Sequence, residues 1–135
     1  MATSPCGHTV FVYGTLLDGE ANHGLLNGAK RLGQAFTPAE FTMHDLGGYP
    51  AIVTGGVTAI RGEVCEIDDH ALGRLDALEG HPHYYQRQHI RLQDGRSVFA
   101  YILPSTQARG FRVIPSGDWR RRDERDSDRQ AASAG

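Results

Sequence analysis

Short apolar runs alternate with glycine-containing turns along most of the chain, and this pattern is typical of a small β-rich domain. Residues 9–13 are mainly β-branched and aromatic and end at Gly14, which predicts a buried strand. Looser alternation over residues 31–46, interrupted at Pro38, predicts one or two more strands. Further strands are expected at residues 51–53, 57–67, 84–92 and 97–103.

One segment has the periodicity of a helix. Over residues 69–78 the apolar side chains form a single stripe, made by Ala71, Leu72, Leu75 and Leu78. Asp68 can accept hydrogen bonds from the first free amides of such a helix, and Gly80 is the residue type that ends one. A second, short helix is expected over residues 20–26.

The connections between strands decide the fold class. Most of them are short turns, and Asp94-Gly95 is a typical hairpin signal. Short turns join antiparallel neighbours, whereas parallel strands need long crossovers. We therefore expect an α+β fold: a small curled or closed, mostly antiparallel β-barrel with one main helix.

The chain is long enough for one domain. Its 135 residues suffice for a single hydrophobic core, which we assign to residues 1–119. The last part of this domain, residues 110–119, reads as a loop, and we expect it to pack Phe111, Val113 and Trp119 against the body.

Charge gives no sign of a nucleic-acid partner. The net charge is −2, so there is no general attraction to phosphate. Residues 120–135 look basic, but counted from Asp118 five arginines oppose five acids. We therefore expect a disordered charged tail rather than an RNA-binding arm.

Other classes of function are also disfavoured. No window approaches the roughly 18 apolar residues of a membrane span, and the first residues lack the features of a signal peptide, so we expect a cytoplasmic protein. Arginine supplies 13 of the 14 basic residues, a bias that indicates a bacterium with a GC-rich genome. Neither Cys6 and Cys65 nor His81 and His83 have the spacing of metal ligands, and no metal is expected.

The segment Tyr13-Gly14-Thr15-Leu16 is the first candidate site. A glycine directly after a buried strand permits backbone angles that aim successive N–H groups at one point, where an anion can bind. The Thr15 hydroxyl can add a further donor. On the tetrapeptide alone, an ordinary turn between strand and loop is the favoured interpretation.

Glu79 is the second candidate. It lies at the end of the predicted helix, close to Leu75 and Leu78, which draws it towards the core. Burial and the negative end of the helix dipole both raise the pKa of such a carboxyl, and a raised carboxyl can transfer protons near neutral pH. A surface glutamate near a helix cap is the alternative interpretation.

Two tyrosines follow closely. Tyr84 and Tyr85 point to opposite faces if they lie on a strand, and Arg87 shares the face of Tyr85. We expect one tyrosine to belong to the core and the other to hydrogen-bond a ligand at the mouth of a site.

These segments together resemble the γ-glutamylcyclotransferase-like family, and more narrowly its short bacterial and γ-glutamylamine cyclotransferase branch. The resemblance runs from about residue 9 to 119. It is carried, in the family's order, by Val10-Phe11-Val12-Tyr13-Gly14-Thr15-Leu16, Gly48-Tyr49-Pro50-Ala51-Ile52, Gly62-Glu63-Val64-Cys65-Glu66-Ile67-Asp68, Leu75-Asp76-Ala77-Leu78-Glu79-Gly80 with Tyr85-Gln86-Arg87, and Gly117-Asp118-Trp119. Cys65 stands where the family usually has a tyrosine.

The resemblance implies a reaction without a cofactor. The backbone from Tyr13 to Leu16 would hold the α-carboxylate of a γ-glutamyl group, and Glu79 would be the catalytic acid and base. The substrate's own α-amine would attack its γ-carbonyl and release 5-oxoproline with a free amine. Tyr85 or a loop amide would stabilise the oxyanion.

Several questions stay open on the sequence alone. A non-catalytic module that binds small molecules could use the same fold. The leaving amine could belong to glutathione, γ-glutamyl-lysine, another amine or a biosynthetic intermediate, and loops around residues 44–56 and 104–117 would select it. The oligomeric state is equally open.

Overall fold

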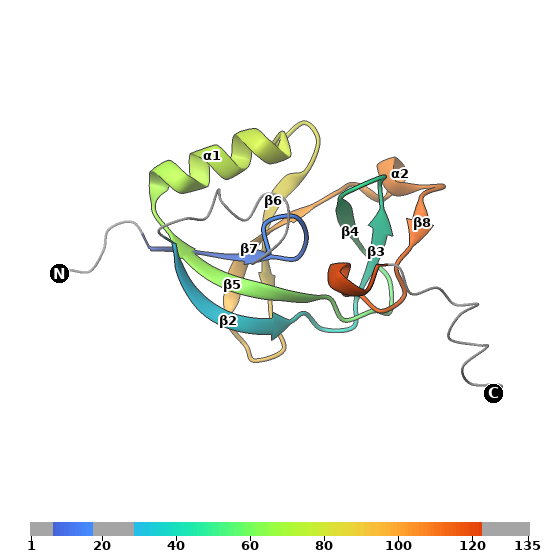
Figure 1. Cartoon of the computed structure of the whole chain (residues 1–135), viewed down its shortest axis with the longest axis horizontal. Helices are drawn as coiled ribbons and strands as arrows, with labels where there is room; N and C mark the ends of the chain where they lie inside the picture. The colour runs from blue at the N-terminus through green and yellow to red at the C-terminus, as the bar shows by residue number, and fades with distance from the viewer. Residues whose placement is uncertain (1–6, 18–28, 123–135) are drawn as a thin grey trace.

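Two β-sheets and a long helix form the part of the chain that the structure, a computed structural model, describes: residues 7–17 and 29–122 (Figure 1). The five-stranded sheet has the order β2 (Lys30–Phe36), β5 (Arg61–Ile67), β1 (His8–Val12), β7 (Ser97–Ile102) and β6 (Gln86–Arg91). The three-stranded sheet has the order β4 (Pro50–Thr54), β3 (Phe41–Asp45) and β8 (Arg112–Val113). The helices are α1 (Asp69–Glu79), α2 (Ser105–Ala108) and the 3-10 helix η2 (Trp119–Arg121).

The predicted α+β, mostly antiparallel architecture is confirmed. Among the described strands, only β1 and β7 pair in parallel, and the other ladders are antiparallel. Of the two predicted forms, curled or closed, the sheet has the curled one, because β2 and β6 remain the edges of an open sheet. The sheet is strongly curled all the same (Figure 1), and at one end Gln93 N–H, just after β6, donates to Phe36 O of β2 at 2.9 Å.

Helix α1 has the predicted caps. The Asp68 carboxylate accepts a hydrogen bond from Ala71 N–H at 2.8 Å, which satisfies one of the free amides at the start of the helix. At the other end Gly80 adopts the left-handed conformation, with φ of 69°, and donates to the backbone of the last turn. This is a conformation that glycine adopts without steric cost.

The apolar stripe of α1 is shorter than predicted. Leu72 and Leu75 are buried under the helix, whereas Leu78 is 43% exposed. Its side chain lies at the mouth of the cavity described below instead of in the core.

Two strand predictions need correction at their ends. Residues 57–60 do not belong to the strand expected at 57–67, since β5 begins at Arg61 and Val57 is 87% exposed. The strand expected at 84–92 begins only at Gln86. Tyr84 and Tyr85 therefore lie in the loop before β6, and the alternation of a strand does not govern their directions.

The C-terminal part of the described chain packs on the body through Trp119, which is 2% exposed. Phe111 and Val113 were expected to pack on the body as well, but both side chains are exposed. Val113 lies on the short edge strand β8, and Phe111 lies just before this strand. Helix α2 was not expected. The helix predicted at residues 20–26 and most of the expected tail fall outside the described residues.

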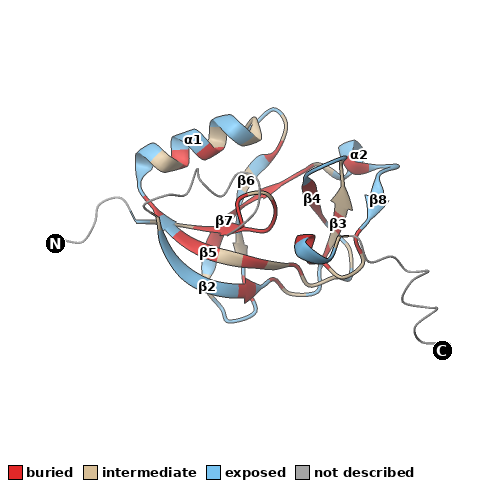
Figure 2. Ribbon diagram, viewed as in Figure 1, coloured by how far each residue is buried: buried red, intermediate tan, exposed pale blue. Residues whose placement is uncertain are grey.

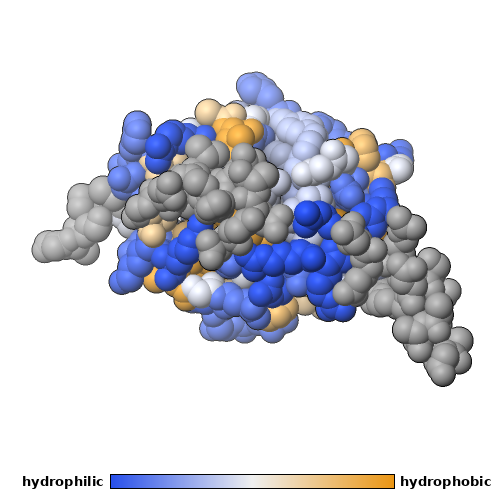
Figure 3. Space-filling view, in the orientation of Figure 1, coloured by the Kyte–Doolittle hydropathy of each residue, from blue (hydrophilic) through white to orange (hydrophobic). Residues whose placement is uncertain are grey.

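The core occupies the inner faces of β1, β5 and β7 and continues through β4, where the buried residues gather (Figure 2). Its largest fully buried side chains include Phe11, Leu17, Met43, Ile52, Ile60, Leu75 and Leu103. The face seen in Figure 3 is mainly hydrophilic, with hydrophobic residues in small separate groups. None of the helices within residues 7–17 and 29–122 is both long and apolar enough to cross a membrane.

The capping of α1 gives a first prediction, because this helix carries Glu79. Asp68→Ala should lower the free energy of unfolding by about 1 kcal/mol, since it leaves a first-turn amide without its acceptor. Asp68→Asn keeps a side-chain oxygen at the cap and should retain most of that stability. Urea denaturation of the three proteins measures the difference, and equal losses in both variants would contradict a capping role.

Candidate active site

A cavity of about 370 Å³ lies where the loop after β1 meets the end of α1 and the start of β4. Its lining includes every residue that the sequence singled out for the site: Tyr13, Gly14, Thr15, Leu16, Glu79 and Tyr85. The structure adds Phe11, Val12, Gly48, Tyr49, Pro50, Leu78, Tyr84 and Tyr101. Two segments far apart in the sequence therefore converge on one cavity, as expected.

The loop after β1 is held in place by the buried strand before it. Val10 and Phe11 are fully buried, and Leu17 N–H donates to Gly14 O at 3.0 Å, which closes a tight turn. Among the described residues, the N–H groups of Gly14 and Leu16 have no hydrogen-bond acceptor. Free amides that line a cavity are suited to hold an anion.

Gly14 is required for a reason other than the one expected. Its φ is not positive, so the left-handed backbone freedom of glycine is not used here. Instead, a Cβ atom at this position would lie 2.5 Å from Cγ and 2.6 Å from Cδ of Pro50. The glycine lets the proline ring pack directly on the loop backbone.

Glu79 is the last residue of α1 and lines the cavity. Its carboxylate has no hydrogen bond or ion pair with any residue that the structure describes, and the last turn of α1 contains no basic residue. Burial raises the pKa of this carboxyl from 4.5 to about 7, because desolvation disfavours the charged form. The sequence predicted that the pKa of Glu79 is raised. This direction is confirmed, and burial is its cause.

Two tyrosine hydroxyls bind backbone carbonyls beside the cavity. Tyr13 Oη donates to Tyr101 O at 2.6 Å, and Tyr85 Oη donates to Pro50 O at 2.6 Å. Both side chains are buried, and burial raises the pKa of both phenols. A phenol has only one proton to donate, so the backbone amides are better placed than Tyr85 to stabilise an oxyanion.

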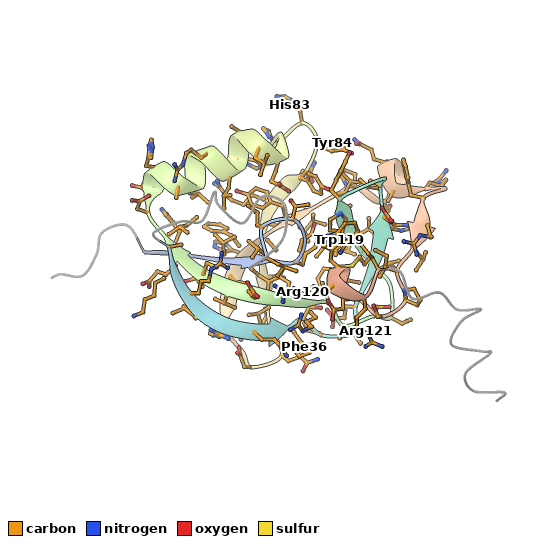
Figure 4. The ribbon with its side chains drawn as sticks, in the orientation of Figure 1. Phe36, His83, Tyr84, Trp119, Arg120 and Arg121 are labelled. Carbon is orange, nitrogen blue, oxygen red and sulfur yellow. The ribbon has the colours of Figure 1, made fainter. Side chains whose placement is uncertain are left out.

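Tyr84 lies at the mouth of the cavity, where one residue of the pair Tyr84 and Tyr85 was predicted. Tyr84 Oη lies 3.1 Å from Tyr49 Oη, so the two phenols form a hydrogen bond between the loop after α1 and the turn before β4. Burial and this hydrogen bond raise the pKa of Tyr84 to about 12. Figure 4 shows Tyr84 extending towards β3 and β4, whereas the neighbouring His83 points away from the body.

A polar group next to the cavity was missed by sequence reasoning. Asp76 accepts a hydrogen bond from Tyr101 Oη at 2.7 Å and forms an ion pair with Arg87, while Arg87 N–H donates to His81 Nδ1 at 2.9 Å. The separation of Asp76 and Glu79 by three residues was the available signal, since it places both on one side of the helix. Within the described parts of the chain, no three His, Cys, Asp or Glu side chains form a group suited to a metal ion.

Comparison with known proteins gives a consistent result. Residues 10–121 match the family model described as gamma-glutamyl cyclotransferase, AIG2-like. A protein of Vibrio cholerae, provisionally named a gamma-glutamylcyclotransferase, is 44% identical over 112 residues, which are 83% of this chain and 95% of that protein. The gamma-glutamylaminecyclotransferase of Bos taurus is 33% identical, covering 76% of this chain and 73% of its own.

Solved structures share the fold. The uncharacterised protein PH0828 of Pyrococcus horikoshii superposes with a TM-score of 0.70 at 26% identity, covering 94% of this chain and 97% of that one. The solution structure of ytfP from Escherichia coli gives a TM-score of 0.64 at 35% identity, covering 86% and 99%.

The contact between Gly14 and Pro50 yields a test of how the loop is held. Gly14→Ala should lower the free energy of unfolding by roughly 1–3 kcal/mol, because the added methyl group overlaps the proline ring. Gly73→Ala is the matched control: it lies in the middle of α1 with open space around a new Cβ, and should raise stability by about 0.5–1 kcal/mol. Urea midpoints that move in the same direction would contradict this account of Gly14.

The buried carboxyl makes the stability depend on pH. In the unfolded chain Glu79 ionises around pH 4.5, and in the folded protein around 7, so its contribution to the free energy of unfolding falls as the pH rises between these values. Glu79→Gln removes this penalty and should be more stable than the parent by roughly 2–3 kcal/mol at pH 8, with little difference at pH 4.

Thermal or urea unfolding at both pH values measures this effect. Glu66→Gln on β5, where the side chain is exposed, is the control and should show no such gain. A Glu79→Gln difference that does not change with pH would mean that the carboxyl is not buried as described.

Proposed function

Since this chain belongs to the gamma-glutamyl cyclotransferase, AIG2-like family, we propose that it is an enzyme that converts a γ-glutamyl amine or amide into 5-oxoproline and a free amine. One observation supports the proposal above the others: a largely desolvated carboxyl, with its pKa raised to about 7, lines the same cavity as backbone amides that have no acceptor among the described residues. These are the two groups that such a reaction needs from a protein that uses no cofactor.

The amides hold the substrate. The α-carboxylate of the γ-glutamyl group accepts hydrogen bonds from the N–H groups of the loop at Gly14 and Leu16, and the Thr15 hydroxyl lies in the same lining. Fixing this end folds the chain so that the α-amine approaches the γ-carbonyl. Proximity of this kind replaces an external nucleophile and accounts for much of the rate enhancement.

Glu79 moves the protons. Its carboxylate takes a proton from the α-ammonium, and the freed amine attacks the γ-carbonyl carbon to form the C–N bond of the five-membered ring. The tetrahedral oxyanion needs a donor other than the two amides that hold the α-carboxylate. As the bond from that carbon to the leaving nitrogen breaks, Glu79 gives this proton to the leaving nitrogen. Glu79 then takes the second proton, which attack leaves on the ring nitrogen, and passes it to the released amine, so the amine departs as an ammonium ion and no water is consumed.

The environment of Glu79 suits both steps. A general base works best when its pKa is close to the working pH, because it must both accept and return a proton. An exposed glutamate would be too weak a base near neutral pH. Burial raises the pKa of Glu79 to the range that this work requires, and no described residue places a positive charge next to its carboxyl.

Replacement of Glu79 tests the proposal. Glu79→Gln should fold and should lower kcat/KM for 5-oxoproline release by a factor of about 100 or more, because the amide cannot carry the proton. The parent protein should show kcat/KM rising with pH through about 7, as the carboxyl of the free enzyme ionises. Glu66→Gln should behave as the parent does.

The assay follows 5-oxoproline by mass spectrometry over a panel of γ-glutamyl compounds. Full activity of Glu79→Gln would remove this residue from the mechanism. Binding of γ-glutamyl compounds by both proteins with no turnover by either would instead indicate the non-catalytic binding module.

A further inference from the structure

Tyr101 on β7 connects the loop that carries the amides to the helix that carries Glu79. Its backbone carbonyl accepts the hydroxyl of Tyr13, which directly precedes Gly14, at 2.6 Å. Its own hydroxyl donates to Oδ1 of Asp76 at 2.7 Å, and Asp76 lies three residues before Glu79 on α1. Tyr101 itself is buried. One residue of the central sheet therefore joins the two halves of the candidate site.

Asp76 uses its two carboxylate oxygens for two different strands. Oδ1 accepts the Tyr101 hydroxyl on β7, and Oδ2 forms an ion pair with Arg87 on β6. Arg87 lies opposite Tyr101 in the antiparallel ladder of β6 and β7, and its guanidinium also lies over the ring of Phe99, 4.9 Å from the centroid. Because two partners on neighbouring strands bind this carboxylate, its direction is fixed and α1 is tied to the sheet at this point.

Asp76 anchors the last turn of α1. Leu75 is buried, but Ala77 and Leu78 after it are exposed. Glu79 ends the turn, and its carboxylate has no hydrogen-bond or ion-pair partner among the described residues. The helix alone therefore positions this carboxylate, and Asp76 is the side chain of the turn that binds the sheet.

The contribution of this anchor to a reaction is geometric. Tyr101 belongs to the cavity lining, whereas Asp76 and Arg87 stand outside it. The single proton of the Tyr101 phenol is donated to Asp76, so it is not offered to a substrate. Reacting groups must lie about 3–3.5 Å apart, and a misplacement of about 1 Å can lower the rate about 100-fold.

We infer that Asp76 is a positioning residue for the proposed reaction: by binding Tyr101 and Arg87 together, it holds the last turn of α1, and with it Glu79, beside the loop amides. The inference rests on the proposed function, because that function gives the position of Glu79 its importance. Loss of Asp76 should act on kcat through Glu79 and should leave the amides, which bind the γ-glutamyl group, as they are.

Asp76 also neutralises a cation near Glu79. The charges of Asp76, Arg87 and Glu79 all influence the pKa of Tyr101, which places the three charges around one hydroxyl. Arg87 N–H in turn binds His81, which follows the helix. Without the charge of Asp76 the guanidinium would be unpaired, and a cation near a carboxyl lowers the pKa of that carboxyl.

The phenols around Glu79 do not supply a competing charge. All five tyrosines of the chain belong to the cavity lining. Burial raises the pKa of four of them, so they stay neutral at the working pH: Tyr13, Tyr84, Tyr85 and Tyr101. A change in the charge of Asp76 should therefore be visible in the ionisation of Glu79.

Two variants test the geometry. Tyr101→Phe removes one hydrogen bond of Asp76 but keeps the ion pair, and should lower kcat for 5-oxoproline release by about 10-fold or more with little change in KM. Asp76→Ala removes both contacts and should lower kcat at least as far. Glu63→Gln is the matched control, because Glu63 on β5 also pairs with arginines but lies outside the lining, and it should keep the kcat of the parent.

Asp76→Asn tests the charge. It keeps an oxygen that can accept the Tyr101 hydroxyl but loses the ion pair, so the rise of kcat/KM with pH should move to lower pH by at least about 0.5. The double variant Asp76→Asn with Arg87→Gln removes the uncompensated cation and should return the rise to its position in the parent. A smaller fraction of folded protein would not move this position, so the pH profile separates a positioning role from a merely structural one.

The outcomes are distinct once kcat is expressed per folded molecule, with the folded fraction taken from circular dichroism. A kcat equal to that of the parent in Tyr101→Phe and Asp76→Ala would overturn the inference and leave the proposed function in place. If Asp76→Ala does not fold, Tyr101→Phe decides alone.

Amide hydrogen exchange decides the inference if the parent releases no 5-oxoproline and the proposed function fails. The N–H groups of Gly80 and His81 donate to carbonyls of the last turn of α1. In Asp76→Ala or Tyr101→Phe they should exchange at least about 10-fold faster than in Glu63→Gln, because opening the turn breaks fewer hydrogen bonds to a charged group. Equal exchange rates would refute the anchoring of this turn by Asp76.

Discussion

Pro50 joins the three segments that form the cavity. Its ring packs on the backbone of Gly14, its carbonyl accepts the Tyr85 hydroxyl at 2.6 Å, and it is the first residue of β4. The loop after β1, the loop after α1 and the second sheet therefore meet at one residue. Together with the hydrogen bonds of Tyr13 and Asp76 to Tyr101, this junction fixes the loop amides relative to Glu79, although they belong to elements that are distant in the sequence.

Glu79 is the residue through which the site lowers the stability of the folded protein. A largely desolvated carboxyl with no partner in residues 7–17 and 29–122 makes the protein less stable at neutral pH than a neutral side chain would. Residues nearby show that the chain could have paired it: Asp76, three residues earlier, has both an arginine and a tyrosine hydroxyl as partners. Desolvation raises the pKa of Glu79 to about 7, whereas Asp76 is held by its partners. One acid therefore supports the structure, and the other is suited to chemistry.

Much of this arrangement could be predicted from local sequence. The strand before Gly14, the Asp68 and Gly80 caps of α1 and the hairpin at Asp94-Gly95 were predictable because neighbouring residues determine them. The candidate residues at the cavity were found in the same way, since each stands where an element ends.

Contacts between distant residues could not be predicted. The role of Gly14 depends on Pro50, and the pairing of Tyr84 depends on Tyr49, each about 35 positions away in the chain. Periodicity placed Leu78 in the core because it does not record where the sheet under the helix ends. Phe111 and Val113 were misjudged for a similar reason, since a hydrophobic residue on an edge strand looks like a buried one in the sequence.

The distribution of tyrosine connects the fold to the chemistry. A cavity that must keep one carboxyl protonated part of the time cannot place a cation beside it, because an opposite charge would lower the pKa again. Phenols provide polar contacts without charge, and in this cavity burial raises the pKa of Tyr13, Tyr85 and Tyr101 above the ordinary value, so they stay neutral.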